Sequence, residues 1–120
     1  MKALGELEME IMGVMWAEGG WITPGEMLAK LDRPLAYTTV MTVMSRLYRK
    51  GLLRRQRDGR AYAYASVSTR EEWLAAQMRS TLVRSPDRPS VLARFVEYLD
   101  ADQVTQLRRM IRSGEAEDAP

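Results

Sequence analysis

The chain has 120 residues, of which 46% are hydrophobic and 28% charged, a composition typical of a globular protein. It contains neither cysteine nor histidine, which excludes disulfides, thiolate nucleophiles, histidine bases and zinc fingers. No carboxylate pair and no glycine-rich phosphate loop stand out, so we expect no enzyme, no metal site and no cofactor.

The N-terminal region lacks the features of a targeting segment. Glu6, Glu8 and Glu10 interrupt any apolar run there, which argues against a signal peptide. No stretch approaches the roughly 20 apolar residues of a membrane span. We therefore expect no membrane insertion and a cytoplasmic location.

Positive charge is concentrated in one part of the chain. The net charge is only +2, yet the segment 46–60 holds a single acid, Asp58, among many basic residues. These basic residues are Arg46, Arg49, Lys50, Arg54, Arg55, Arg57 and Arg60. One basic patch on a near-neutral protein is typical of a phosphate-binding surface.

Apolar spacing predicts a first helix over residues 4–18, ended by Gly19-Gly20, with its glutamates mostly on the outer face. A short extended piece, Trp21-Ile22, follows. Thr23, Pro24 and Glu26 then form a capping box that predicts a second helix over 24–31. The large apolar residues of this region are expected in the core, namely Met9, Met12, Met15, Trp16 and Trp21.

A third helix is predicted over residues 37–50, with Gly51 as its left-handed end. Its narrow apolar stripe consists of Val40, Val43, Met44 and Leu47. At 100° per residue, the opposite side carries hydroxyls and arginine, namely Thr38, Thr42, Ser45 and Arg49. Thr39 and Arg46 fall on one flank and Met41 on the other. Such a face suits base edges and phosphates, although a solvated surface helix has a similar composition.

A basic hairpin is predicted next, with Asp58-Gly59 as the turn between two extended runs. Tyr62 and Tyr64 share one strand face. Arg54, Arg55, Arg57 and Arg60 crowd like charges together, and phosphates would relieve their repulsion. Three helices followed by a basic hairpin are the chain order of a winged helix-turn-helix.

The remainder is predicted to be helical. Ser68 and Thr69, with Glu71 and Glu72, offer overlapping capping boxes for a fourth helix. The run 85–89 breaks the chain before a helix over 90–99, and Asp100 with Gln103 caps a last helix. These helices carry apolar stripes that a second subunit would cover, namely Trp73, Leu74, Met78, Leu82, Leu92, Phe95, Val96, Leu99, Val104, Leu107, Met110 and Ile111.

The predicted fold is thus mainly α with a small β-hairpin wing. A winged helix-turn-helix domain would span 1–67, a helical dimerisation arm 68–113, and a disordered acidic tail 114–120. The predicted DNA contacts are Thr38, Thr39, Thr42, Ser45, Arg46, Arg49, Lys50, Arg54, Arg55, Arg57 and Arg60. The alternative is a winged helix that docks a protein or lipid partner without sequence-specific DNA binding.

Several motifs together resemble the BlaI/MecI family of penicillinase repressors. They are Leu4-Gly5-Glu6-Leu7-Glu8, Met15-Trp16, the runs 36–43, 46–53 and 58–62, and Arg94-Phe95-Val96-Glu97. The resemblance implies a homodimer that represses transcription from a palindromic operator with TGTA/TACA-type half-sites, and control of β-lactam resistance or related stress genes. By position, it implies contacts from Thr38, Thr39, Thr42 and Arg46, and a wing contact from Arg60.

The same resemblance implies that a membrane-linked metalloprotease relieves repression by cutting in the C-terminal region. The matching bond is Arg94-Phe95, where the staphylococcal relatives have Asn-Phe.

Overall fold

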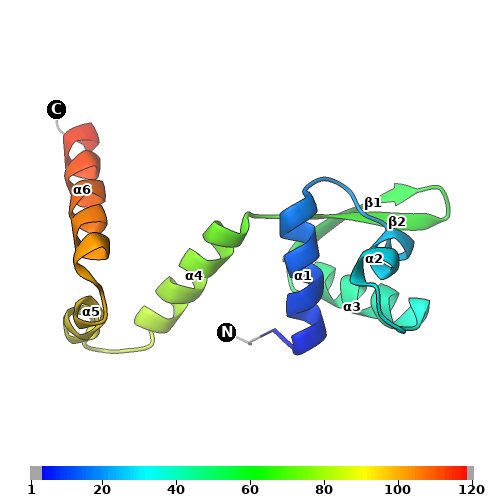
Figure 1. Ribbon diagram of the computed structural model, residues 1–120, viewed down its shortest axis with the longest axis horizontal. Helices are drawn as coiled ribbons and strands as arrows, with labels where there is room; N and C mark the ends of the chain where they lie inside the picture. The colour runs from blue at the N-terminus through cyan, green and yellow to red at the C-terminus, as the bar shows by residue number, and fades with distance from the viewer. Residues whose placement is uncertain (1–3, 119–120) are drawn as a thin grey trace. The chain divides into compact units, whose positions relative to one another are not determined.

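The computed structural model describes residues 4–118, and the chain divides into two compact units, Met1–Ala76 and Gln77–Pro120. The first unit contains α1 (Glu6–Glu18), α2 (Pro24–Leu31), α3 (Tyr37–Arg49), β1 (Leu53–Asp58), β2 (Ala61–Ser66) and the start of α4 (Arg70–Leu82). The second contains the rest of α4, α5 (Arg88–Glu97) and α6 (Ala101–Asp118). Three helices followed by an antiparallel hairpin confirm the predicted winged-helix fold (Figure 1).

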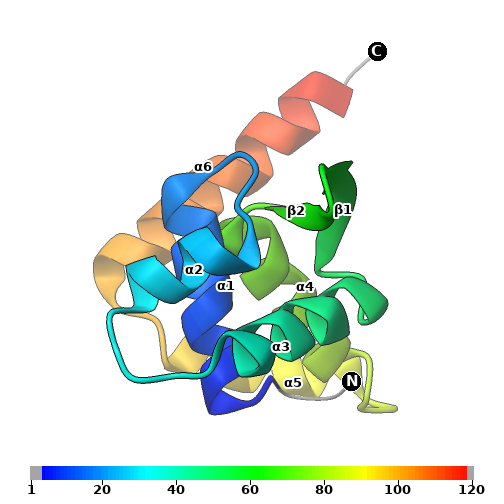
Figure 2. The same ribbon diagram turned by 90° about the vertical axis from the view of Figure 1, so that its right-hand side faces the viewer.

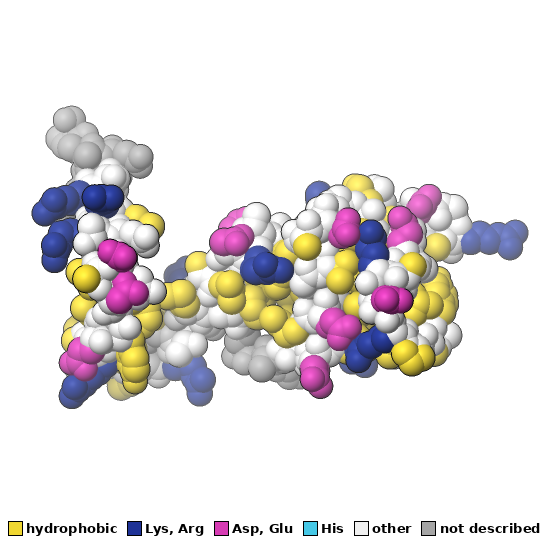
Figure 3. Space-filling model, in the orientation of Figure 1, with side chains coloured by type: hydrophobic (Ala, Val, Ile, Leu, Met, Phe, Trp, Pro, Cys, Tyr) yellow, Lys and Arg dark blue, Asp and Glu magenta, His cyan; other side chains and the backbone are white. Residues whose placement is uncertain are grey.

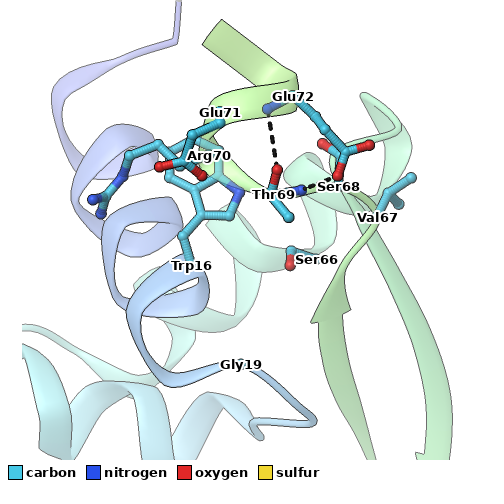
Figure 4. A pocket seen from close by; sticks show the side chains of 9 residues that line it. All are labelled: Trp16, Gly19, Ser66, Val67, Ser68, Thr69, Arg70, Glu71 and Glu72. Carbon is cyan, nitrogen blue, oxygen red and sulfur yellow. Dashed lines mark hydrogen bonds between the residues drawn. The ribbon is translucent and has the colours of Figure 1, made fainter. Parts of the chain in front are cut away.

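Local capping starts the helices where the sequence predicts. The Glu26 amide donates to Thr23 Oγ1 (3.2 Å) and the Thr23 amide to Glu26 Oε1 (3.1 Å) at the start of α2. Of the two boxes predicted for α4, the structure forms the one between Thr69 and Glu72, with both bonds at 3.1 Å (Figure 4). These bonds satisfy amides that have no partner inside the helix.

Two predictions for the C-terminal part are wrong. Helix α5 begins at Arg88, two residues early, because the Ser90 amide donates to Asp87 Oδ1 (3.2 Å) and Pro89 fits the first turn. The predicted disorder from 114 is contradicted because α6 continues to Asp118. Alanine and glutamate, which are strong helix formers, occupy this segment, and residues 119–120 lie outside the described part.

The core of the first unit is built on α3. Val40, Val43, Met44 and Leu47 are all buried, as predicted, and pack with apolar residues of α1 and α2. Their burial orients α3, because an amphipathic helix must place its apolar stripe against the other elements.

The predicted inward face of α1 is partly wrong. The buried stripe is Glu8, Ile11, Met12 and Met15, so Glu8 lies on the core side rather than the outer face. Met9 and Trp21 were expected in the core, but each is 39% exposed. The i, i+3, i+4, i+7 stripe excludes Met9, and Trp21 belongs to the loop after α1.

The hairpin turn lies one residue beyond the predicted position. Asp58 pairs with Ala61, so the two-residue loop is Gly59-Arg60, and Gly59 has a φ of 65°. A positive φ at the first loop position alone is typical of a type II′ turn, which suits the strand twist.

Other segments hold the base of the hairpin. The Ile22 amide donates to the Tyr64 carbonyl (2.8 Å), and the Tyr64 amide donates to the Ile22 carbonyl (2.9 Å). The Leu52 amide donates to the Leu47 carbonyl of α3 (3.0 Å), and the Val67 amide donates to the Leu52 carbonyl (3.0 Å), which joins the two ends of the hairpin. The hairpin is therefore tied to the α1–α2 loop at one end, while its turn is free of such bonds.

Helix α4 starts on the first unit. The rings of Trp16 and Trp73 lie 5.5 Å apart, and the guanidinium of Arg70 lies 5.6 Å from the Trp16 ring. Figure 4 shows Trp16 and Arg70 side by side at this junction. These contacts explain why the unit extends to Ala76, beyond the boundary predicted after residue 67.

Within residues 4–118, none of the helices has the combined length and apolar character that crossing a lipid bilayer requires.

Met44 and Met41 provide a matched test of this core. Met44 is fully buried, whereas Met41 on the same helix is 41% exposed. We expect Met44→Ala to lower the free energy of unfolding by about 2–5 kcal/mol, because it leaves a cavity. Met41→Ala should change it by about 0.5 kcal/mol or less. Urea denaturation followed by tryptophan fluorescence measures both, and equal losses would contradict the packing described.

Candidate nucleic-acid interface

The outward side of α3 presents a polar surface. Thr38, Thr39, Thr42 and Arg46 are exposed, and together with Val43 they line an open hollow along the helix. Arg49 is exposed as well, and Ser45 is partly buried. The small hydroxyl side chains permit close approach of a ligand backbone, while arginine can reach bases or phosphates.

The hairpin lies beside the C-terminal end of α3 (Figure 2). Arg54, Arg57 and Arg60 of the hairpin are exposed, and Arg60 occupies the turn itself. Figure 3 shows basic side chains projecting at the far right, where Figure 1 places this turn. The first unit therefore offers a polar helix face and exposed cations on an adjacent hairpin.

Strand alternation separates the arginines that the sequence suggested would crowd together. Arg55 and Arg57 lie opposite Tyr64 and Tyr62 on one face of the hairpin. Arg54 lies on the other face, with its guanidinium 5.1 Å from the centre of the Trp21 ring. Because Arg54 lies on the opposite face of the hairpin from Arg55 and Arg57, the repulsion between these arginines is smaller than the sequence suggested.

Arg55 differs from the other hairpin arginines. Its guanidinium lies 4.0 Å from the Tyr48 ring centre and 4.1 Å from the Tyr62 ring centre, and the residue is partly buried. A hydrogen bond to the Tyr64 side chain is the main cause that raises the pKa of this guanidinium. The guanidinium therefore lies against aromatic rings while the residue remains partly exposed.

Lys50, predicted as a DNA contact, is engaged inside the protein. Its Nζ donates to Glu8 Oε2 at 2.7 Å, and the Gly5 amide donates to the other carboxylate oxygen at 2.9 Å. The hydrogen bond from Lys50, followed by that from Gly5, lowers the pKa of Glu8. Because Glu8 is only 7% exposed, Lys50 is needed as its counter-charge, so this lysine has a structural role besides the DNA contact that the sequence predicts.

Comparison with known proteins gives the family. The chain matches the penicillinase repressor family model over residues 4–113. It belongs to the penicillinase repressor family. Transcriptional regulator BlaI of Mycobacterium tuberculosis is 40% identical over 121 residues, which cover 97% of this chain and 88% of that protein. The penicillinase repressor of Bacillus licheniformis is 23% identical and covers 90% of this chain and 88% of its own.

Solved structures agree with this assignment. The solution structure of the DNA-binding domain of the repressor BlaI matches with a TM-score of 0.50 and 26% identity, over 60% of this chain and 93% of that domain. A MarR family protein from Bacillus stearothermophilus shares the fold, with a TM-score of 0.50 and 21% identity over 97% of this chain and 76% of its own. As a penicillinase repressor family member, the chain is a DNA-binding transcriptional repressor of the winged-helix kind.

The C-terminal helices of this repressor expose many of the apolar residues predicted for dimerisation. Eight of them are between 38% and 66% exposed, namely Leu74, Met78, Leu92, Phe95, Val96, Leu107, Met110 and Ile111. Leu82, Leu99 and Val104 are partly buried. Trp73 differs from the other predicted dimer residues because its ring packs on Trp16 of the same chain.

Three residues of the first unit contribute to the candidate interface although the sequence analysis did not assign them to it. Tyr48 and Trp21 hold arginines of the hairpin, and Glu8 holds Lys50. An aromatic residue close to a basic run is a usable signal for cation–π contacts. No local signal pairs Glu8 with Lys50, since the two lie 42 residues apart.

The Glu8–Lys50 pair predicts a specific pH dependence of stability. The pKa of Glu8 is lower in the folded state than its ordinary value of 4.5. The pair therefore stabilises the fold above that pH, and the stabilisation is lost as the pH falls through the folded pKa. We expect Glu8→Gln to lower the free energy of unfolding at neutral pH and to reduce its decline on acidification.

The control for this experiment is Glu18→Gln, which removes a surface pair with Lys30 whose Glu18 side chain is 48% exposed. Exposed pairs contribute little, so this variant should follow the wild-type profile. Urea denaturation over a pH series measures all three proteins. If the free energy of unfolding of Glu8→Gln declined on acidification as steeply as that of the wild type, the role of the buried pair would be refuted.

Proposed function

We propose that this repressor binds a palindromic operator as a homodimer, with α3 of each subunit in the major groove and the hairpin on the adjacent backbone. One observation carries the proposal: α3 buries its apolar stripe and leaves its threonine and arginine face open beside exposed arginines of the same unit. A recognition helix and wing in this arrangement fit the geometry of winged helix-turn-helix readers.

The contributions of the side chains follow from their chemistry. Thr38, Thr39, Thr42 and Arg46 are proposed to contact bases and nearby phosphates, since they line the open side of α3. Ser45 and Arg49 extend that face. Arg54, Arg57 and Arg60 are proposed to neutralise phosphates, because they are the exposed cations of the hairpin.

Dimerisation is supported by the C-terminal helices. A monomer would leave the apolar residues of α5 and α6 in contact with water, and their burial against a second copy is favourable. A two-fold dimer would in turn present two α3 helices to two half-sites, which is the basis for proposing a palindrome.

Relief of repression by proteolysis is proposed from the family resemblance. The Arg94 side chain is 80% exposed and Phe95 is 40% exposed, but their bond lies inside α5. A protease would have to unwind this helix to cut there, so a membrane-linked metalloprotease would act on a locally opened form. Genes of β-lactam resistance or a related stress are the proposed targets.

Arg46→Ala tests base reading by α3. We expect it to weaken binding to a duplex with a TACA/TGTA inverted repeat, and to reduce discrimination against a scrambled duplex by about 1–3 kcal/mol if Arg46 contacts a base. Fluorescence anisotropy at fixed salt measures both affinities. Lys30→Ala removes a surface cation paired with Glu18 and should bind like wild type. Equal wild-type affinity for both duplexes would instead favour a protein-docking module.

Phe95→Glu tests the dimer. Phe95 and Val96 lie on the apolar side of α5, and a charge there would oppose burial against a second copy. We expect a dimer at micromolar concentration for the wild type and a monomer for Phe95→Glu, measured by sedimentation equilibrium. Glu97→Ala, at a position paired with Arg94 at the surface, should remain dimeric. A monomeric wild type would remove the proposed dimer.

A further inference from the structure

The strongest unassigned feature of the first unit is a stack of three side chains from three elements. Tyr48 comes from the end of α3, Arg55 from β1 and Tyr62 from β2. The Arg55 guanidinium lies between the two rings, 4.0 Å from the centre of Tyr48 and 4.1 Å from that of Tyr62. Both distances are well within the range in which an arginine is attracted to an aromatic face.

This stack adds a side-chain link between α3 and the hairpin beyond the backbone bonds at the hairpin base. Those backbone bonds run between Ile22 and Tyr64, and from the Leu52 amide to the Leu47 carbonyl of α3. Tyr62 lies nearer the turn, opposite Arg57. A link from Tyr62 through Arg55 to Tyr48 therefore restrains the hairpin against the end of α3.

Other arginines of the hairpin lack this arrangement. Arg57 approaches Tyr62 at 5.3 Å and is exposed, and Arg54 approaches Trp21 at 5.1 Å and is exposed. Arg55 is partly buried and contacts two rings from different elements. Its planar guanidinium suits stacking, which a lysine ammonium cannot reproduce.

We propose that Arg55 is a positioning residue that fixes the spacing between α3 and the hairpin, and that it does not itself contact a phosphate. The proposal rests on the proposed function and deepens it. The DNA contact that the sequence predicts for Arg55 is made instead by the exposed arginines of the hairpin. Correct spacing matters because helix and hairpin must meet the groove and the backbone at the same time. Arg55, with Tyr48 and Tyr62, is called the Arg55 clamp below.

Charge-conserving and charge-removing variants separate the clamp from a phosphate contact. We expect Arg55→Lys and Arg55→Met to weaken binding to the TACA/TGTA duplex by a similar factor of about ten, because neither side chain can stack a planar guanidinium against two rings at once. A phosphate contact would survive in Arg55→Lys, since lysine also binds phosphate. Near wild-type affinity of Arg55→Lys would therefore overturn the proposal. Arg33→Lys, at a surface arginine of the same unit that pairs with Glu10, is the matched control and should bind like wild type.

Variants of Tyr48 provide an independent test of the Arg55 clamp. Tyr48→Leu should weaken binding by a smaller factor than Arg55→Met, because the Tyr62 ring still contacts Arg55, whereas Tyr48→Phe keeps the ring and should bind like wild type. The double variant Arg55→Met/Tyr48→Leu should lose no more than Arg55→Met alone, because the Tyr48 contact is already absent in that variant. Additive losses would mean that the two residues act separately, and would overturn the clamp.

A readout without DNA keeps the two proposals distinguishable. In NMR spectra of the free full-length protein, the two rings should shift the Arg55 side-chain protons upfield, and Tyr48→Leu should reverse part of that shift while the Tyr62 ring maintains the rest. No ring-current shift in the wild type would overturn the clamp whatever the DNA results. A shift with equal binding of operator and scrambled duplexes would instead refute the proposed function.

Thermal denaturation establishes that each variant is folded. If Arg55→Met fails to fold, Arg55→Lys together with the Tyr48→Leu and Tyr48→Phe pair decides the outcome by the criteria above.

Discussion

Burial of the α3 stripe is the constraint on which the rest of the winged-helix unit depends. Val40, Val43, Met44 and Leu47 pack against α1 and α2, and this contact determines which side of α3 faces water. The threonines and arginines become available to a ligand because the opposite side of the same helix is occupied by the core. A loss of packing on one side of α3 would therefore disturb its exposed polar side as well.

The basic segment 46–60 is not a uniform cationic surface. Lys50 neutralises a buried carboxylate, and Arg55 is stacked between two tyrosines. Arg46, Arg57 and Arg60 remain exposed. Neighbouring cations thus differ in their surroundings, because a folded domain must satisfy its own buried charges while its remaining cations stay at the surface.

The C-terminal helices differ from the first unit in that many of their large apolar side chains are exposed. Exposed residues such as Phe95 and Met110 would gain by burial against a second copy. Helix α4 belongs to both parts: its start is held on the winged-helix unit by Trp16 and Trp73, and its end leads into the second unit.

The sequence by itself determined the helices, their caps, the hairpin and the opposed faces of α3, because these depend on residues within a few positions of one another. Thr23 with Glu26 and Thr69 with Glu72 are such local pairs. Only the tertiary structure decided how the cations are used. Lys50 finds Glu8 across 42 residues, and Arg55 finds rings on two other elements. Contacts of this kind follow from how helices and strands pack: an aromatic residue near a basic run suggests the second, but no local pattern of residues pairs Glu8 with Lys50.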